Sequence, residues 1–65
     1  MATTVDKHLA NMVEIVLSTG SKREMQMYYE SLTFQERAEL MAYMQAFTMQ
    51  SLLNTIRNHA ENLAK

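Results

Sequence analysis

Two histidines are the residues of this sequence that first suggest metal or acid–base chemistry. Neither His8 nor His59 has a second histidine or a carboxylate four residues further on. The spacings Glu-x-x-His and His-Glu-x-x-His, which place metal ligands on one face of a helix, do not occur. We therefore interpret both histidines as solvated surface residues, and we expect no metal ion or cofactor.

A pair of glutamates is the other candidate for chemistry. Glu36 and Glu39 lie about one helical turn apart, and paired carboxylates can do acid–base work when burial separates their pKa values. Acids near a helix N-terminus also stabilise the helix dipole, which explains this pair without catalysis. No G-x-S-x-G sequence and no glycine-rich phosphate loop is present. We therefore expect a protein that is not an enzyme.

The composition indicates an all-α fold. The chain has 65 residues with no cysteine, no proline and a single glycine, so it has few turn residues for β-hairpins. Met, Ala, Leu, Glu and Gln, which favour helices, are abundant. So short a chain forms one domain with a small core, and such domains are often stabilised by a second subunit.

Charge and hydropathy argue against two classes of partner. The net charge is −1, without the basic surface that nucleic acid binding requires. The longest apolar run, Leu40–Met44, is far shorter than the ~20 residues that span a bilayer. The first residues do not resemble a secretory signal. We expect a cytoplasmic protein that does not contact a membrane, and the charge disfavours nucleic acid as its partner.

The first two helices are predicted at residues 4–18 and 22–31. Apolar residues follow one stripe of the first helix, and Gly20 is placed to end it. Ser21 and Glu24 have the spacing of a capping box that opens the second helix. The stripe of the first helix comprises Val5, Leu9, Met12, Val13 and Val16.

A third helix is predicted to begin after a second capping box, formed by Thr33 and Glu36. No glycine, proline or further capping box follows, so the pattern favours one continuous helix over residues 34–63. The alternative is a break near residues 48–51, which would give four helices.

The stretch Leu40–Ile56 contains no charged residue. On a helical wheel its apolar residues form one arc before Thr48 and a second arc, on another side, after it. If the helix is continuous, one small monomer cannot easily bury both arcs. We therefore predict a helical homodimer with the second arc at its interface. The predicted interface residues are Ala46, Met49, Leu52, Leu53, Ile56, Ala60 and Leu63. All of them except Leu52 follow the alternating steps of three and four residues of a short coiled coil.

The alternative to the dimer is a monomer in which the helix breaks and its last segment folds back. In either case the function indicated by this sequence is protein–protein interaction, in a regulator (inhibitor, anti-activator or adaptor) that binds a larger protein. The candidate contacts are Arg23, Met27 and Tyr28, because methionine and tyrosine suit binding surfaces. The remaining alternatives are a dimeric nucleic-acid-binding regulator of helix-turn-helix type and a structural assembly subunit.

Overall fold

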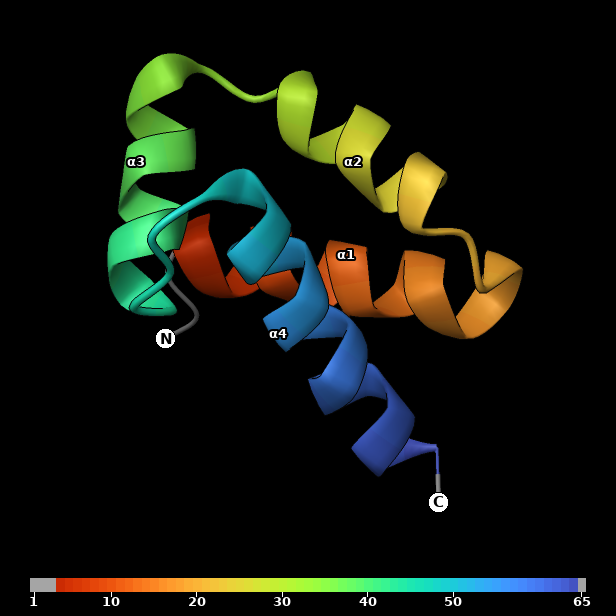
Figure 1. The fold of residues 1–65 in the computed structure, drawn as a ribbon. Coiled ribbons are helices and arrows are strands. Elements are labelled where there is room, and N and C mark those ends of the chain that lie inside the picture. Colours follow the sequence, from red (N-terminus) through yellow and green to blue (C-terminus); the bar gives the residue numbers. More distant parts are fainter. Residues whose placement is uncertain (1–3, 65) are drawn as a thin grey trace.

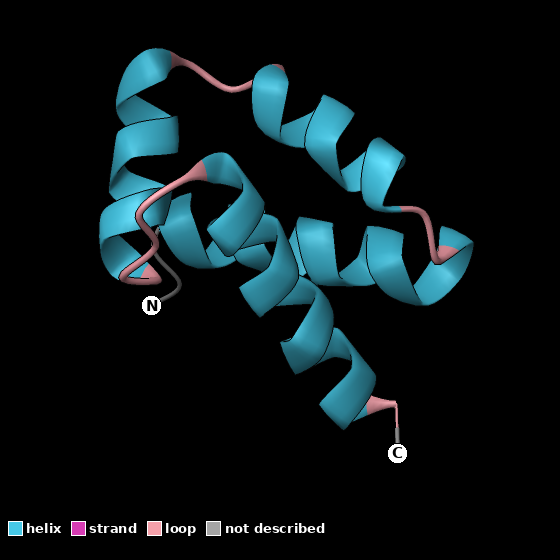
Figure 2. Cartoon of the chain, viewed as in Figure 1, coloured by secondary structure: helices cyan, strands magenta, loops and turns pink. Residues whose placement is uncertain are grey.

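A computed structural model describes residues 4–64, and the described chain consists of helices joined by short turns (Figures 1 and 2). The helices are α1 (Thr4–Thr19), α2 (Lys22–Glu30), α3 (Phe34–Tyr43) and α4 (Met49–Leu63). The all-α prediction is confirmed for this part of the chain. The prediction of three helices is wrong, because the stretch expected to form one helix over residues 34–63 is divided into α3 and α4.

Helix α1 is the central element, since it packs against each of the other three. In Figure 1, α2 runs back above α1, α3 descends beside the N-terminal end of α1, and α4 crosses α1. Helix α2 also contacts α4, and the Lys22 ammonium donates a hydrogen bond of 2.8 Å to the Asn54 side-chain oxygen. The arrangement leaves α1 covered by α2 and α3 on one side and by α4 on another.

The core contains residues from all four helices. Helix α4 supplies the largest share, because Leu52, Leu53, Ile56 and Ala60 are all fully buried. Burial of apolar side chains contributes about 1.5–3 kcal/mol per large residue, so α4 is essential to this small core. The buried residues from the other helices are Met12, Met25, Tyr29 and Leu40.

The first connection follows the sequence expectation closely. Gly20 has φ +66°, a conformation that favours glycine, and its N–H donates to the Val16 carbonyl at 2.8 Å. The Ser21 hydroxyl accepts from the Glu24 N–H, as predicted. The Ser21 N–H, however, donates to the Thr19 hydroxyl rather than to Glu24, so this capping box is only half formed. The capping box of Thr33 and Glu36 has both bonds and is confirmed.

The predicted long helix ends after Tyr43 in a Schellman motif that contains no glycine. Gln45 takes the left-handed position with φ +54°. The Ala46 N–H donates to the Met41 carbonyl at 2.9 Å, and the Gln45 N–H donates to the Ala42 carbonyl at 3.2 Å. The break therefore lies between Tyr43 and Met49, slightly earlier than the predicted alternative at residues 48–51.

Helix α4 then begins at Thr48, whose hydroxyl accepts from the Ser51 N–H at 3.1 Å. Because the chain reverses between α3 and α4, the second apolar arc faces the core of its own chain. Leu52, Leu53, Ile56 and Ala60 are inaccessible there, so a second copy cannot contact them in this fold. Of the other predicted interface residues, Ala46 and Met49 pack against the core and Leu63 is exposed. The reason for predicting a dimer through this surface is therefore removed.

Candidate functional site

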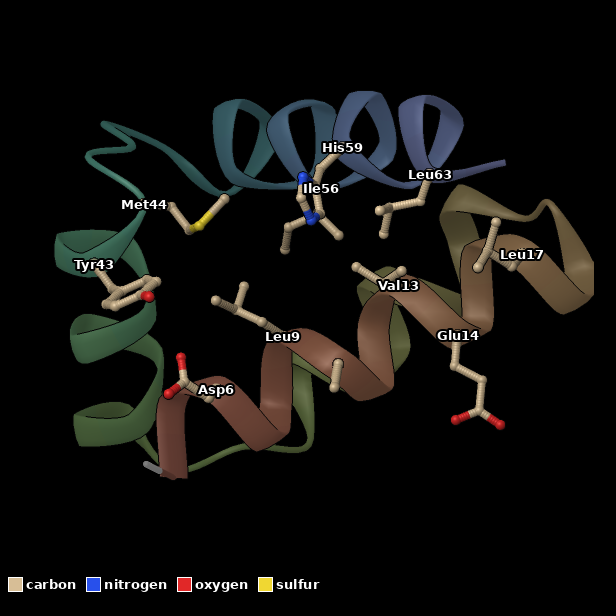
Figure 3. Close-up of a pocket in the computed structure, with 11 residues that line it drawn as sticks. Asp6, Leu9, Val13, Glu14, Leu17, Tyr43, Met44, Ile56, His59 and Leu63 are labelled. Atoms are coloured by element: carbon tan, nitrogen blue, oxygen red, sulfur yellow. The ribbon is translucent and has the colours of Figure 1, made fainter. Parts of the chain in front are cut away.

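A groove lies between α1 and α4 in the described structure, with the last turn of α3 at one end (Figure 3). Its volume is about 620 Å³, within the ~300–1,000 Å³ of typical ligand sites. Helix α1 contributes Asp6, Leu9, Ala10, Val13, Glu14 and Leu17. Tyr43 and Met44, from the end of α3, and Ile56, His59 and Leu63, from α4, complete the lining. We refer to this feature as the α1–α4 groove.

The base of the groove is apolar and its rim exposes large apolar side chains. Figure 3 shows Leu9 and Val13 directed from α1 toward α4, and Leu63 directed from α4 toward α1. At the rim, Leu17 is 52% exposed, Tyr43 59% and Leu63 60%. Large apolar side chains grouped around a hollow mark binding surfaces more often than isolated ones do.

The charged residues at the groove are acidic. Asp6 and Glu14 belong to its lining, which contains no lysine or arginine. In Figure 3 the Glu14 carboxylate extends from α1 on the side away from α4, so it lies at the outer edge of the groove. The groove therefore combines an apolar base with an acidic edge along α1.

Most of this site was missed by sequence reasoning. Ile56 and Leu63 were predicted as interface residues, whereas Leu17, Tyr43 and His59 were not predicted as site residues. A signal for Leu17 was present, because Leu9, Val13 and Leu17 repeat every four residues and so share one face of a helix. Nothing in the sequence indicated that Tyr43 and α4 would line the same groove, because that depends on the turn at Gln45.

The other side of α1 carries a polar network instead of a groove. The His8 Nδ1 atom lies 2.9 Å from the Tyr28 hydroxyl, and the Asn11 side-chain amide donates to the same hydroxyl at 2.8 Å. The His8 Nε2 atom lies 2.8 Å from a carboxylate oxygen of Glu36. Because a carboxylate only accepts, Nε2 carries the hydrogen in this arrangement. The network connects α1 to both α2 and α3.

This network corrects the interpretation of His8. The His8 side chain is only 13% exposed and has partners at both nitrogens, so it is not a solvated surface residue. Glu36 belongs to the capping box, as the sequence indicated, and Glu39 accepts a hydrogen bond from Gln35. Hydrogen bonds from the Thr33 backbone, from His8 and from the Thr33 hydroxyl lower the pKa of Glu36. Its environment thus favours the ionised carboxylate.

The three candidate partner contacts on α2 lie in different surroundings. Arg23 is exposed and Met27 is 54% exposed. Tyr28 is only partly exposed, and its hydroxyl is engaged by His8 and Asn11. That hydroxyl already takes part in a network inside the protein, so a partner at Tyr28 would contact its partly exposed ring, and its role as a contact stays a prediction. Met27 is the exposed apolar residue that remains on α2.

A smaller hollow of about 360 Å³ lies where α2, α3 and the start of α4 meet. Arg37 lines it, and the buried Nε atom of Arg37 has no hydrogen-bond partner. Phe34, 81% exposed, stands at its edge. Burial raises the pKa of Tyr29, which also lines this hollow, and the charge of Arg37 acts in the opposite direction. The hollow has a cation but a shallower apolar surface than the α1–α4 groove.

Among residues 4–64, no group of three or more His, Cys, Asp or Glu side chains is placed to hold a metal ion. Within the same described range, no helix has both the length and the apolar character needed to cross a membrane. Comparison with protein-family models finds no family that matches the chain. Comparisons with curated proteins and with solved structures also give no significant match.

Proposed function

We propose that this protein is a protein–protein interaction module that binds an amphipathic helix of a larger protein in the α1–α4 groove. The groove itself carries this proposal. It offers about 620 Å³ of mostly apolar space, and three large side chains at its rim are more than half exposed. Covering Leu17, Tyr43 and Leu63 would remove apolar surface from water, which is the main driving force of protein association.

A helix suits this groove better than an extended peptide. An extended peptide usually binds by adding a strand to the edge of a sheet, and residues 4–64 contain no strand. A helix can instead place its ridges of side chains between those of α1 and α4. The lining on α1 runs from Asp6 to Leu17, roughly 16 Å or three helical turns. The partner helix therefore needs apolar residues at positions i, i+4 and i+7.

The charge of the groove defines the partner further. Glu14 lies at the outer edge and Asp6 belongs to the lining, with no lysine or arginine among the lining residues. A lysine or arginine beside the apolar stripe of the partner would complement this acidic edge. Edge charges of this kind mainly raise the association rate and make it sensitive to salt. Binding should therefore weaken moderately as the salt concentration rises.

The effect of the α1–α4 groove on the larger protein would come from covering the helix that it binds. Covering a helix that the larger protein needs would make it an inhibitor or anti-activator. Presenting that helix to a third protein would make it an adaptor. In each case the groove provides the contact, and the helices behind it provide a rigid support.

A pair of matched variants tests the proposal. Leu17 and Met27 are helical residues of nearly equal exposure, 52% and 54%, but only Leu17 lines the groove. Glutamine favours helices about as well as leucine and methionine, so Leu17→Gln and Met27→Gln change the surface with little effect on folding. The probe is a model helical peptide with leucines at i, i+4 and i+7 and flanking lysines.

Isothermal titration calorimetry should show that Leu17→Gln weakens peptide binding by at least fivefold, which corresponds to loss of a contact of ~1 kcal/mol or more. Met27→Gln should bind as the unmodified protein does. A twin peptide with glutamates in place of lysines should bind less tightly. If Met27→Gln alone weakens binding, the site is on α2. If neither peptide binds, the proposed helical partner is wrong.

A further inference from the structure

The connection between α3 and α4 is unusual for a sharp reversal of the chain. Residues 44–48 contain neither glycine nor proline, and Gln45 adopts φ +54°. An L-residue with a β-carbon reaches this left-handed conformation only at a cost in free energy. Met44, Gln45 and Ala46 are instead residue types that favour a continuous helix. Local sequence preference and the observed turn therefore disagree at this connection.

A continuous helix over residues 34–63 would remove the strain at Gln45. It would also carry α4 away from the core of its own chain, where Leu52, Leu53 and Ile56 are fully buried. Exposing these side chains is far more costly than the strain, so a single chain cannot straighten. A second copy, however, carries an identical α4. If two chains straighten together and exchange α4, each core regains the same contacts.

Exposed apolar side chains near the connection between α3 and α4 also favour an exchange of α4 between two chains. Phe47 is 93% exposed, the highest value among the exposed large apolar residues, and Tyr43 is 59% exposed. In a continuous helix these two residues, four positions apart, would lie on one face. In a two-fold symmetric exchange the two connecting segments cross near the symmetry axis. Phe47 and Tyr43 of one chain can then cover those of the other.

We infer that this protein has a second, dimeric form, in which residues 34–63 form one helix and α4 of each chain packs in the core of the other. The monomer and this dimer share the packing of α4 on α1 and α2 and differ in the connecting segment. The inference does not rest on the proposed function, because its evidence is the connection and the core. Tyr43 is common to both, since it lines the groove in the monomer and would be covered in the dimer.

The experiment uses the complete chain, unfolded in guanidinium chloride and refolded at about 1 mM, since dimer formation depends on protomer concentration. Unfolding first lets α4 leave its own core. Size-exclusion chromatography with light scattering then measures the mass. The unmodified protein should give a dimer that persists after dilution, because its dissociation requires α4 to leave a core.

Two variants test whether the connection between α3 and α4 is what makes the dimer form. Gln45→Gly relieves the strain of the turn and weakens the continuous helix, so it should raise the dimer dissociation constant by about a hundredfold or more. Phe47→Gln keeps the helix preference but removes the exposed ring, and should raise that constant by about tenfold. A protein that remains monomeric after refolding overturns the inference. So does a dimer that Gln45→Gly leaves unchanged, because such a dimer would form through another surface.

Discussion

The two sides of α1 differ in whether their side chains have partners within the chain. On one side, His8 and Asn11 make hydrogen bonds to Tyr28, and His8 also contacts Glu36, so the polar groups facing α2 and α3 have partners. On the other side, Leu9 and Val13 lead to the exposed Leu17 in an apolar groove. On the first side, the polar groups find their hydrogen-bond partners within the chain. The second leaves apolar surface in contact with water.

This difference separates residues that hold the fold from residues free to bind. Satisfied, partly buried hydrogen bonds fix the relative positions of helices, and a partner cannot use those groups without breaking them. Exposed apolar side chains around a hollow cost the fold little if they are replaced and supply binding energy if they are covered. We therefore expect substitutions on the hydrogen-bonded side of α1 to lower the stability of the fold, and substitutions on the groove side to weaken binding.

The largest effect is expected at Met12, which is fully buried and lies one turn beyond His8. Met12→Ala should lower the free energy of unfolding by about 2–5 kcal/mol, because it removes core packing and leaves a cavity. Leu17→Ala should cost less than about 1 kcal/mol, because the side chain is already half exposed. Urea denaturation followed by circular dichroism measures both, and equal losses would show that the groove side is part of the core.

A smaller effect is expected from Tyr28→Phe, which keeps the ring and removes the hydroxyl. His8 and Asn11 then lose a shared hydrogen-bond partner, at a cost of about 1–2 kcal/mol in the free energy of unfolding. A double-mutant cycle with His8→Ala isolates the part that belongs to the His8–Tyr28 contact. If Tyr28→Phe leaves stability unchanged but weakens a partner, Tyr28 belongs to a binding surface after all.

The smallest effect is expected from the titration of Glu36. Its pKa in the folded state is lowered from 4.5, first by the Thr33 backbone N–H and then by His8 and the Thr33 hydroxyl. A lowered folded-state pKa means that the stabilisation is present above the unfolded-state value and is lost as the pH falls through the folded-state value. The melting temperature of the unmodified protein should therefore fall more steeply below pH 4.5 than that of Glu36→Gln. Parallel curves would show that Glu36 contributes no pH-dependent stability.

The parts of the fold that the sequence predicted are those with local signals. Gly20, Ser21 and Thr33 identified the boundaries of the first three helices, because glycine and hydroxyl residues have specific roles at helix ends. The end of α3 had no such signal, since Gln45 occupies a position that usually belongs to glycine. The change of the apolar arc near Thr48 was visible in the sequence. It was interpreted as a second interface, when it marks the point where the chain turns back.

The candidate site could be predicted only in part, because it is formed by side chains from separate helices. The predicted apolar stripe of α1 already contained Leu9 and Val13, and the spacing of four residues could have added Leu17 to it. The partners of that face come from other helices: Tyr43 lies at the end of α3, and Leu63 reaches the groove only because the chain turns between α3 and α4. The network of His8 likewise depends on Tyr28 and Glu36, 20 and 28 residues further along the chain. Contacts over such separations leave no periodic pattern.

A nuclear magnetic resonance titration of the isotope-labelled protein with the lysine-flanked model helix would locate the binding site residue by residue. We expect backbone resonances around Val13, Leu17, Tyr43 and Leu63 to shift together and saturate, while those around Arg23 and Met27 stay in place. The shifts should also become smaller at higher salt for the same peptide concentration. Shifts confined to α2, or scattered over the surface without saturation, would contradict the assignment of the α1–α4 groove as the binding site.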